Sequence, residues 1–251
     1  ADAPFRAAAL AGAAQGDLAT VLSRVDREGL DRFGRFLCRH YYRERVVHYF
    51  KYSRALAPLT GRAPEAVLKT PEFNALMPHL VLGERASAQR VLDLLQRHLN
   101  ETAEPIRAAV PYWDVLIAYQ SIFFLSDAHP PPQETGPYPA RAQTAAILEL
   151  SWNLPAVLPL LLRPFRELPL PPQQATRLLF ARSEHGEVTV LRCPDTVRDL
   201  LESLTGREDP AQVAARLGLD PQALGKTLER LEQLGAVITR ESFSASHVGS
   251  E

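Results

Sequence analysis

The chain has 251 residues and a formal net charge of −1, from 28 basic and 29 acidic side chains. Its length allows one large domain or two small ones, and 46% hydrophobic with 23% charged residues is typical of a globular protein. This composition excludes a wholly disordered chain, and the balanced charge excludes a protein that is basic throughout, as a nucleic-acid coat would be.

Proline divides the chain. Of 21 prolines, 11 fall between Pro130 and Pro172. Because proline has no N–H and a fixed φ, these stretches interrupt helices and central strands. We therefore expect a helical N-terminal domain over 1–128, a proline-rich connector with a short helix or strand over 129–174, a second domain over 175–241 and a flexible tail over 242–251.

The first domain is predicted to be all-helical, because its apolar residues recur at helical spacing. A first helix would follow Asp17 as N-cap, with Leu18, Val21, Leu22 and Val25 on one face. Further helices are expected over 26–57, after Thr70, after Ser87 and over 110–128. The last of these is apolar on all sides, which indicates a buried central helix.

The stretch 31–54 is strongly basic. Its seven basic residues face only Asp31 and Glu44, which gives a local charge of +5 before histidines are counted. Such a helix suits the docking of an acidic protein. The docking residues are predicted to be Arg35, Arg39, Tyr42, Arg43 and Trp113. The alternatives are a solvated face whose arginines pair with acids elsewhere, and a core position for Trp113.

The second domain has a different pattern. Residues 175–183 and 187–193 are rich in β-prone side chains and are joined at Glu184-His185-Gly186, which predicts a hairpin. Three amphipathic helices are expected over 195–206, 209–218 and 220–235, the last two opening on Asp-Pro and ending on Gly. A short strand over 236–241 would return to the hairpin. These elements predict a winged helix, in a chain that is mainly α with a small β component.

Winged helices bind DNA or peptides, and charge bears on the choice. Residues 194–251 hold six basic and ten acidic side chains, a net of −4. DNA binding depends on cations that neutralise phosphates, so this charge favours peptide capture, in which an extended peptide pairs with an open strand edge.

The peptide site is expected on the second hairpin strand and the third helix. Val188 and Val190 would face the core, since side chains alternate along a strand. The predicted binding residues are Glu187, Val188, Thr189, Val190, Leu191, Leu224, Thr227 and Leu231. For the leucines of this helix, packing in the domain core is the alternative.

No self-sufficient catalytic or metal-binding motif is found. Cys38-x-His40 offers two metal ligands where a site needs about four, so Cys38 is expected to be a small core residue. With only Cys193 besides it, neither a disulfide scaffold nor a four-cysteine zinc site is possible. No apolar run reaches the length of a membrane span, and the Ala-rich start lacks the order of a secretory signal. We expect a cytoplasmic protein.

Several stretches together resemble one family. They are FGRFLCRHYYRERVVHYFKYSRALAPLTG with FNALMPHLVLG, then PYWDVLIAYQSIFF, then LELSWNLPAVLPLLLRPF and RLLFARSEHGEVTVLRCPDTVRDLLESLTG. Over residues 30–238 they are similar to the MbnC- and TglI-like partner subunits of multinuclear non-haem iron enzymes, which modify cysteines in ribosomally made peptides. The resemblance rests on apolar and turn patterns and does not distinguish between these two types.

The resemblance implies a noncatalytic subunit without a cofactor of its own. Its winged helix would act as a recognition element for the leader of a precursor peptide, and it would present a cysteine to a TIM-barrel enzyme that holds the iron. Neither nucleic acid nor a membrane would be a partner. The main alternative is a winged-helix transcriptional regulator, and a third reading is an enzyme that uses Cys38 or a histidine pair.

Overall fold

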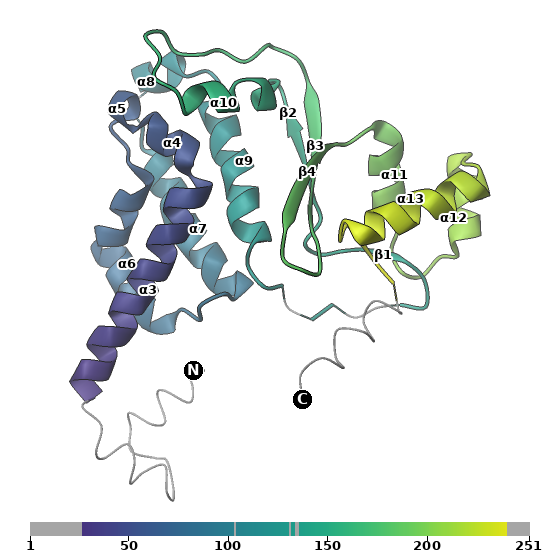
Figure 1. Ribbon diagram of the computed structural model, residues 1–251, viewed down its shortest axis with the longest axis horizontal. Coiled ribbons are helices and arrows are strands. Elements are labelled where there is room, and N and C mark those ends of the chain that lie inside the picture. Colours follow the sequence, from purple (N-terminus) through teal and green to yellow (C-terminus); the bar gives the residue numbers. More distant parts are fainter. Residues whose placement is uncertain (1–26, 103, 131, 134–135, 240–251) are drawn as a thin grey trace, which may run out of the picture. The chain divides into compact units, whose positions relative to one another are not determined.

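The computed structural model describes residues 27–102, 104–130, 132–133 and 136–239, and the chain divides into two units (Figure 1). Unit 1 runs to Ala128 and includes Leu161–Arg166, and unit 2 comprises His129–Leu160 and the chain from Glu167 on. Helices make up 57% and strands 12% of the described residues, so the fold is mainly α with a small β component, as predicted. The predicted helix after Asp17 and the predicted flexible tail lie outside the described residues.

Unit 1 is helical throughout its described residues. Its elements are α3 (Arg27–Tyr49), α4 (Lys51–Ala55), α5 (Ala57–Thr60), the 3-10 turn η1 (Pro64–Lys69), α6 (Pro71–Leu76), η2 (Met77–His79), α7 (Arg85–Asn100), α8 (Glu104–Ala109) and α9 (Trp113–Ser126).

The predicted central helix is confirmed as α9, which packs against α7 and α3. It carries Trp113, Leu116 and Phe124 into the core, where each is at most 1% exposed. The expected helix over 26–57 is divided at Phe50, between α3 and α4. Gln120 of α9 supports that break, because its Oε1 accepts the backbone N–H groups of Tyr52 and Ser53 at 3.1 and 3.2 Å.

Unit 2 combines short strands with three capped helices. Its elements are β1 (Ala140–Arg141), β2 (Ala146–Leu150), η3 (Leu154–Ala156), α10 (Leu158–Leu161, which ends at the passage into unit 1), β3 (Thr176–Arg182), β4 (Val188–Arg192), α11 (Asp195–Ser203), α12 (Pro210–Leu217), α13 (Pro221–Gln233) and β5 (Val237–Ile238).

The predicted hairpin is confirmed as β3 and β4, but the sheet around it differs from the prediction. Its order is β2-β3-β4, all antiparallel, so the third strand comes from the segment that was expected to be a connector. The final strand, β5, pairs with β1 rather than with the hairpin. The expectation that 236–241 returns to the hairpin is therefore wrong, since the residues opposite it lie far upstream and carry no pairing signal in the sequence.

Unit 1 ends at Ala128, where the helical domain was expected to end, but unit 2 begins at His129 and not at residue 175. The connector over 129–174 contributes β1 and β2 to unit 2 and Leu161–Arg166 to unit 1. Proline disrupts local hydrogen bonding, but strand pairing and packing decide which unit a segment joins.

The three helices of unit 2 follow their sequence signals closely. The Asp209 carboxylate caps α12 by accepting the Ala211 N–H at 2.7 Å, and Asp220 caps α13 through the Ala223 N–H at 2.8 Å. Gly218 ends α12 in the left-handed conformation, with φ of 64°. These caps satisfy backbone groups at the helix ends, so the boundaries are set locally.

Candidate functional site

The β3–β4 hairpin presents an open strand edge. β4 is the last strand of its sheet, and it pairs only with β3. The turn closes through the Gly186 N–H, which donates to the Ser183 carbonyl at 2.9 Å, with Gly186 at φ of 86°.

The backbone groups on this edge belong to alternate residues. Bonded and non-bonded pairs alternate along an antiparallel ladder. The Ser183 N–H donates to the Glu187 carbonyl and the Cys193 N–H donates to the Arg177 carbonyl, both at 2.9 Å. Counting in steps of two between these bonds, the backbone N–H and C=O groups of Glu187, Thr189 and Leu191 point toward β3 and bond to it.

The N–H and C=O groups of Val188, Val190 and Arg192 consequently point away from β3. Within the described part of the chain, these three N–H groups and three carbonyls meet no strand. They form a template for one additional strand.

The same register shows on which face of the sheet each side chain of β4 lies. Thr189 and Leu191 lie opposite Ala181 and Leu179, which belong to the helix-side core, as does Cys193. Val188 and Val190 lie opposite Arg182 and Phe180 on the other face of the sheet. The two valines were expected to face inward, and they lie half-buried on the face that carries the fully buried Phe180, whereas the helices of unit 2 pack on the other face. Both sheet faces carry apolar side chains, so alternation alone did not identify the core side.

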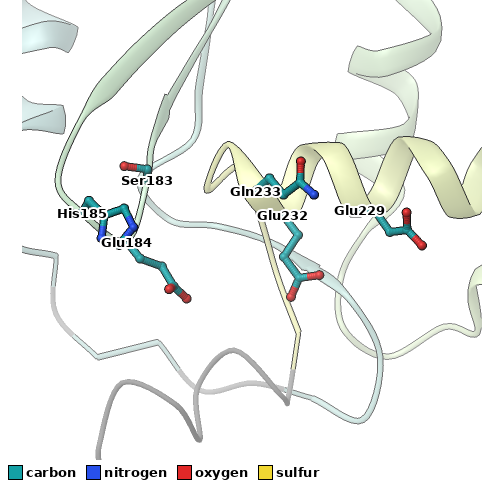
Figure 2. Close-up of a pocket in the computed structure, with 6 residues that line it drawn as sticks. All are labelled: Ser183, Glu184, His185, Glu229, Glu232 and Gln233. Carbon is teal, nitrogen blue, oxygen red and sulfur yellow. The ribbon is translucent and has the colours of Figure 1, made fainter. Parts of the chain in front are cut away.

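A cleft of about 350 Å³ lies between the hairpin turn and α13 (Figure 2). The turn contributes Ser183, Glu184 and His185, and the helix contributes Glu229, Glu232 and Gln233. Three of the six lining residues are acidic, so the cleft favours cations over anions. Glu232 also accepts a hydrogen bond from the Thr239 hydroxyl.

Gly235 sets the distance between the hairpin and the helix end. It has φ of 74°, and a Cβ at this position would lie 1.9 Å from the Arg182 carbonyl oxygen. Only glycine permits both this conformation and this approach. The sequence identified Gly235 as a helix stop but gave no indication of its contact with β3.

The predicted leucines of α13 do not line an exposed groove. Leu224 and Leu231 are 4% and 5% exposed and belong to the core of unit 2, so their predicted role in peptide binding is wrong. They lie on the amphipathic face that holds α13 against its neighbours. Thr227 is half-buried, and its hydroxyl donates to the Ala223 carbonyl at 2.8 Å.

Two of the five predicted docking residues are also buried. Tyr42 is fully buried and Trp113 is 1% exposed, and the Trp113 indole N–H donates to the Leu99 carbonyl at 3.3 Å. Neither can meet a partner, so this part of the docking prediction is wrong. A helical pattern rich in tyrosine and arginine does not by itself show which side faces the core.

The predicted docking arginines are more exposed, but two of them have partners within unit 1. Arg35 pairs with Asp31 one turn away at 2.7 Å, and Arg39 donates to the Leu68 carbonyl and the Asn74 side chain. Arg43 is exposed to solvent. The positive charge of α3 is thus partly used within the unit.

A basic and apolar hollow of about 490 Å³, not predicted from the sequence, lies elsewhere on unit 1. It is formed by α4 and the segment after α10, with the lining residues Lys51, Arg54, Ala55, Leu161, Leu162, Arg163, Pro164 and Phe165. Lys51 and Arg54 were counted in the basic stretch, but Arg163 and Phe165 lay in the expected connector.

The two cysteines are buried and far apart in sequence. Cys38 and Cys193 are 6% and 5% exposed, and burial raises the pKa of the Cys193 thiol. Among the described residues, no three His, Cys, Asp or Glu side chains gather as a metal site would require. None of the described helices combines the length and hydrophobicity needed to cross a membrane.

Comparisons with known proteins add no family. A scan against models of protein families finds no match, and a search of curated proteins also finds none.

Proposed function

We propose that the chain is a noncatalytic, peptide-binding partner subunit. In this proposal, unit 2 is a winged-helix recognition element that binds the leader of a ribosomally made precursor peptide. The protein then presents a cysteine of that peptide to a TIM-barrel, multinuclear iron enzyme, which supplies the iron and the chemistry.

The open edge of β4 is the observation that carries the proposal. The outward N–H and C=O groups of Val188, Val190 and Arg192 match the alternating pattern of a peptide in extended conformation. A strand added here would lie on a hairpin whose turn faces α13 across the acidic cleft (Figure 2). The backbone groups of Glu187, Thr189 and Leu191 are already bonded to β3, so these residues would contact the peptide through their side chains alone.

The register determines which substitution tests this edge. Val190→Pro removes an outward N–H without removing a bond to β3, whereas Thr189→Pro removes an N–H that bonds to Ala181. We expect Val190→Pro to weaken leader binding at least tenfold while circular dichroism stays unchanged. The control Val190→Thr keeps the N–H and should bind normally.

The experiment is a calorimetric or anisotropy titration with the leader of a Cys-bearing precursor encoded beside this chain. Normal affinity in folded Val190→Pro would remove β4 from the binding site. If the unmodified chain binds no such leader and does not co-purify with a co-expressed iron enzyme, the partner role itself is wrong.

A winged-helix transcriptional regulator is the second candidate. It is favoured by the capped helix pair α12 and α13, whose exposed side chains include Lys226 and Arg230. The acidic Glu229 and Glu232 lie on the same helix, so we expect only weak, sequence-independent DNA binding. Nanomolar, sequence-specific binding in an anisotropy titration would favour the regulator instead.

A further inference from the structure

An apolar stripe lies exposed on the first turns of α3. Leu30, Phe33 and Leu37 recur at i, i+3 and i+7, and Phe36 lies beside Phe33 on the same side of the helix. Their exposed fractions are 54%, 57%, 40% and 63% in the order Leu30, Phe33, Leu37 and Phe36. Four large side chains exposed together on one helix face form a patch that favours burial against another surface.

This stripe is separate from the face that holds α3 in unit 1. The buried positions Cys38, Tyr42 and Val46 follow one another at four-residue spacing. At 3.6 residues per turn, that row runs along the other side of the helix. The stripe therefore does not continue the core of unit 1.

We propose that the occupant of the stripe is the chain's own segment immediately before α3, residues 17–26. This segment carries Leu18, Val21, Leu22 and Val25, spaced as a helix face over eight residues. The stripe, from Leu30 to Leu37, also extends over eight residues. The two apolar sets thus match in length and in number.

The position of the segment in the chain strengthens this assignment. It ends where α3 begins, at Arg27, so it is tethered within one turn of Leu30. Because the segment and the stripe belong to one chain, their contact is intramolecular, and a separate partner has to compete with it.

A second copy of the chain fits the stripe less well. Arg32 borders it on one side, next to Phe36 on the helical surface. In an antiparallel two-fold helix pair the same edge of each copy meets itself, so this arginine would face its own counterpart. The segment 17–26 instead contributes Asp17 and Asp26 against a single Arg24.

Thiol accessibility tests the proposal in the full chain. Leu30→Cys places a reactive thiol in the stripe, while Cys38 and Cys193 are buried and give a slow background. We expect labelling by a maleimide to be at least tenfold slower in this variant than in the same variant that also carries Leu18→Glu and Leu22→Glu. Leu59→Cys is the matched control, because Leu59 is 43% exposed in the same unit and should label equally in both backgrounds.

Each other outcome overturns the proposal. Equal, fast labelling at Leu30→Cys in both backgrounds would show that the stripe is open in the isolated chain and serves a different partner. Protection that rises with protein concentration and survives the two glutamates, with a dimer in light scattering, would identify a second copy. If the glutamates disturb helicity, the milder pair Leu18→Ala and Leu22→Ala is measured in their place.

Discussion

The two units are built from different kinds of core. Unit 1 encloses large aromatic side chains, including Trp113, Tyr42 and Phe73, each at most 1% exposed. The helix-side core of unit 2 consists of aliphatic residues, alanines and Cys193. Aromatic packing joins residues far apart in sequence, whereas the small helices of unit 2 rely on local caps and close backbone approach. The two units should therefore respond to different substitutions.

The largest expected effect is in the aromatic core. Trp113→Ala removes a buried indole and its hydrogen bond to Leu99, which should cost unit 1 about 3–5 kcal/mol. Amide hydrogen exchange, measured separately for the two units, should be faster in α7 and α9 and unchanged in β3 and α13. Equal loss of protection in unit 2 would show that the cores are not independent.

A substitution at Gly235 is expected to destabilise unit 2 and leave unit 1 unchanged. Gly235→Ala imposes a left-handed conformation on alanine and brings Cβ against the Arg182 carbonyl. The cost should be about 2–4 kcal/mol, localised to unit 2.

Gly218→Ala is the matched control for Gly235→Ala. Gly218 has a similar φ of 64°, but a Cβ at this position would meet no atom within 4 Å. It should cost only about 1–2 kcal/mol. If urea titrations give the two variants the same stability, the close approach at Gly235 has no energetic role.

A smaller effect tests the buried polar contact of unit 1. Gln120→Ala leaves the N–H groups of Tyr52 and Ser53 without their acceptor, which should cost about 1–3 kcal/mol. Gln96→Ala, which removes a half-buried bond to Ser121, should cost less. Thermal unfolding of the two variants measures the difference. Equal midpoint temperatures would contradict the larger contribution assigned to Gln120.

The smallest effect concerns acid stability of unit 2. A hydrogen bond from Arg177 lowers the pKa of the exposed Asp195 carboxyl below its usual value of about 3.9. Because the folded pKa is the lower one, this contribution is present at neutral pH and is lost as the pH falls below about 4. Asp195→Asn should therefore flatten the decline in unit 2 stability between about pH 5 and pH 3. An unchanged slope in urea titrations across that range would exclude this ion pair as its source.

The helices of unit 2 could be predicted from sequence because their signals are local. Asp209 and Asp220 cap helices that begin at the next residue, and Gly218 ends one of them. The hairpin turn at Gly186 is equally local. For these elements the residues that set the boundary lie within a few positions of it.

The partner-facing residues could not be predicted in the same way. Leu224 and Leu231 share a helical face that suits a groove as well as a core, and only the packing shows that they are buried. Tyr42 and Trp113 likewise have side chains suited to an interface, yet both are enclosed by distant residues. The sequence pattern shows that a face is apolar, but it does not show what covers that face.

The sequence by itself determined the helical content, the caps, the β3–β4 hairpin and the acidic character of the C-terminal helices, since each depends on composition or on neighbours along the chain. Only the tertiary structure decided that β2 joins β3, that β5 pairs with β1, and that Val188, Val190 and Arg192 present the open edge. Strand pairing joins residues separated by tens of positions, and its hydrogen-bond phase depends on register, which no local preference specifies.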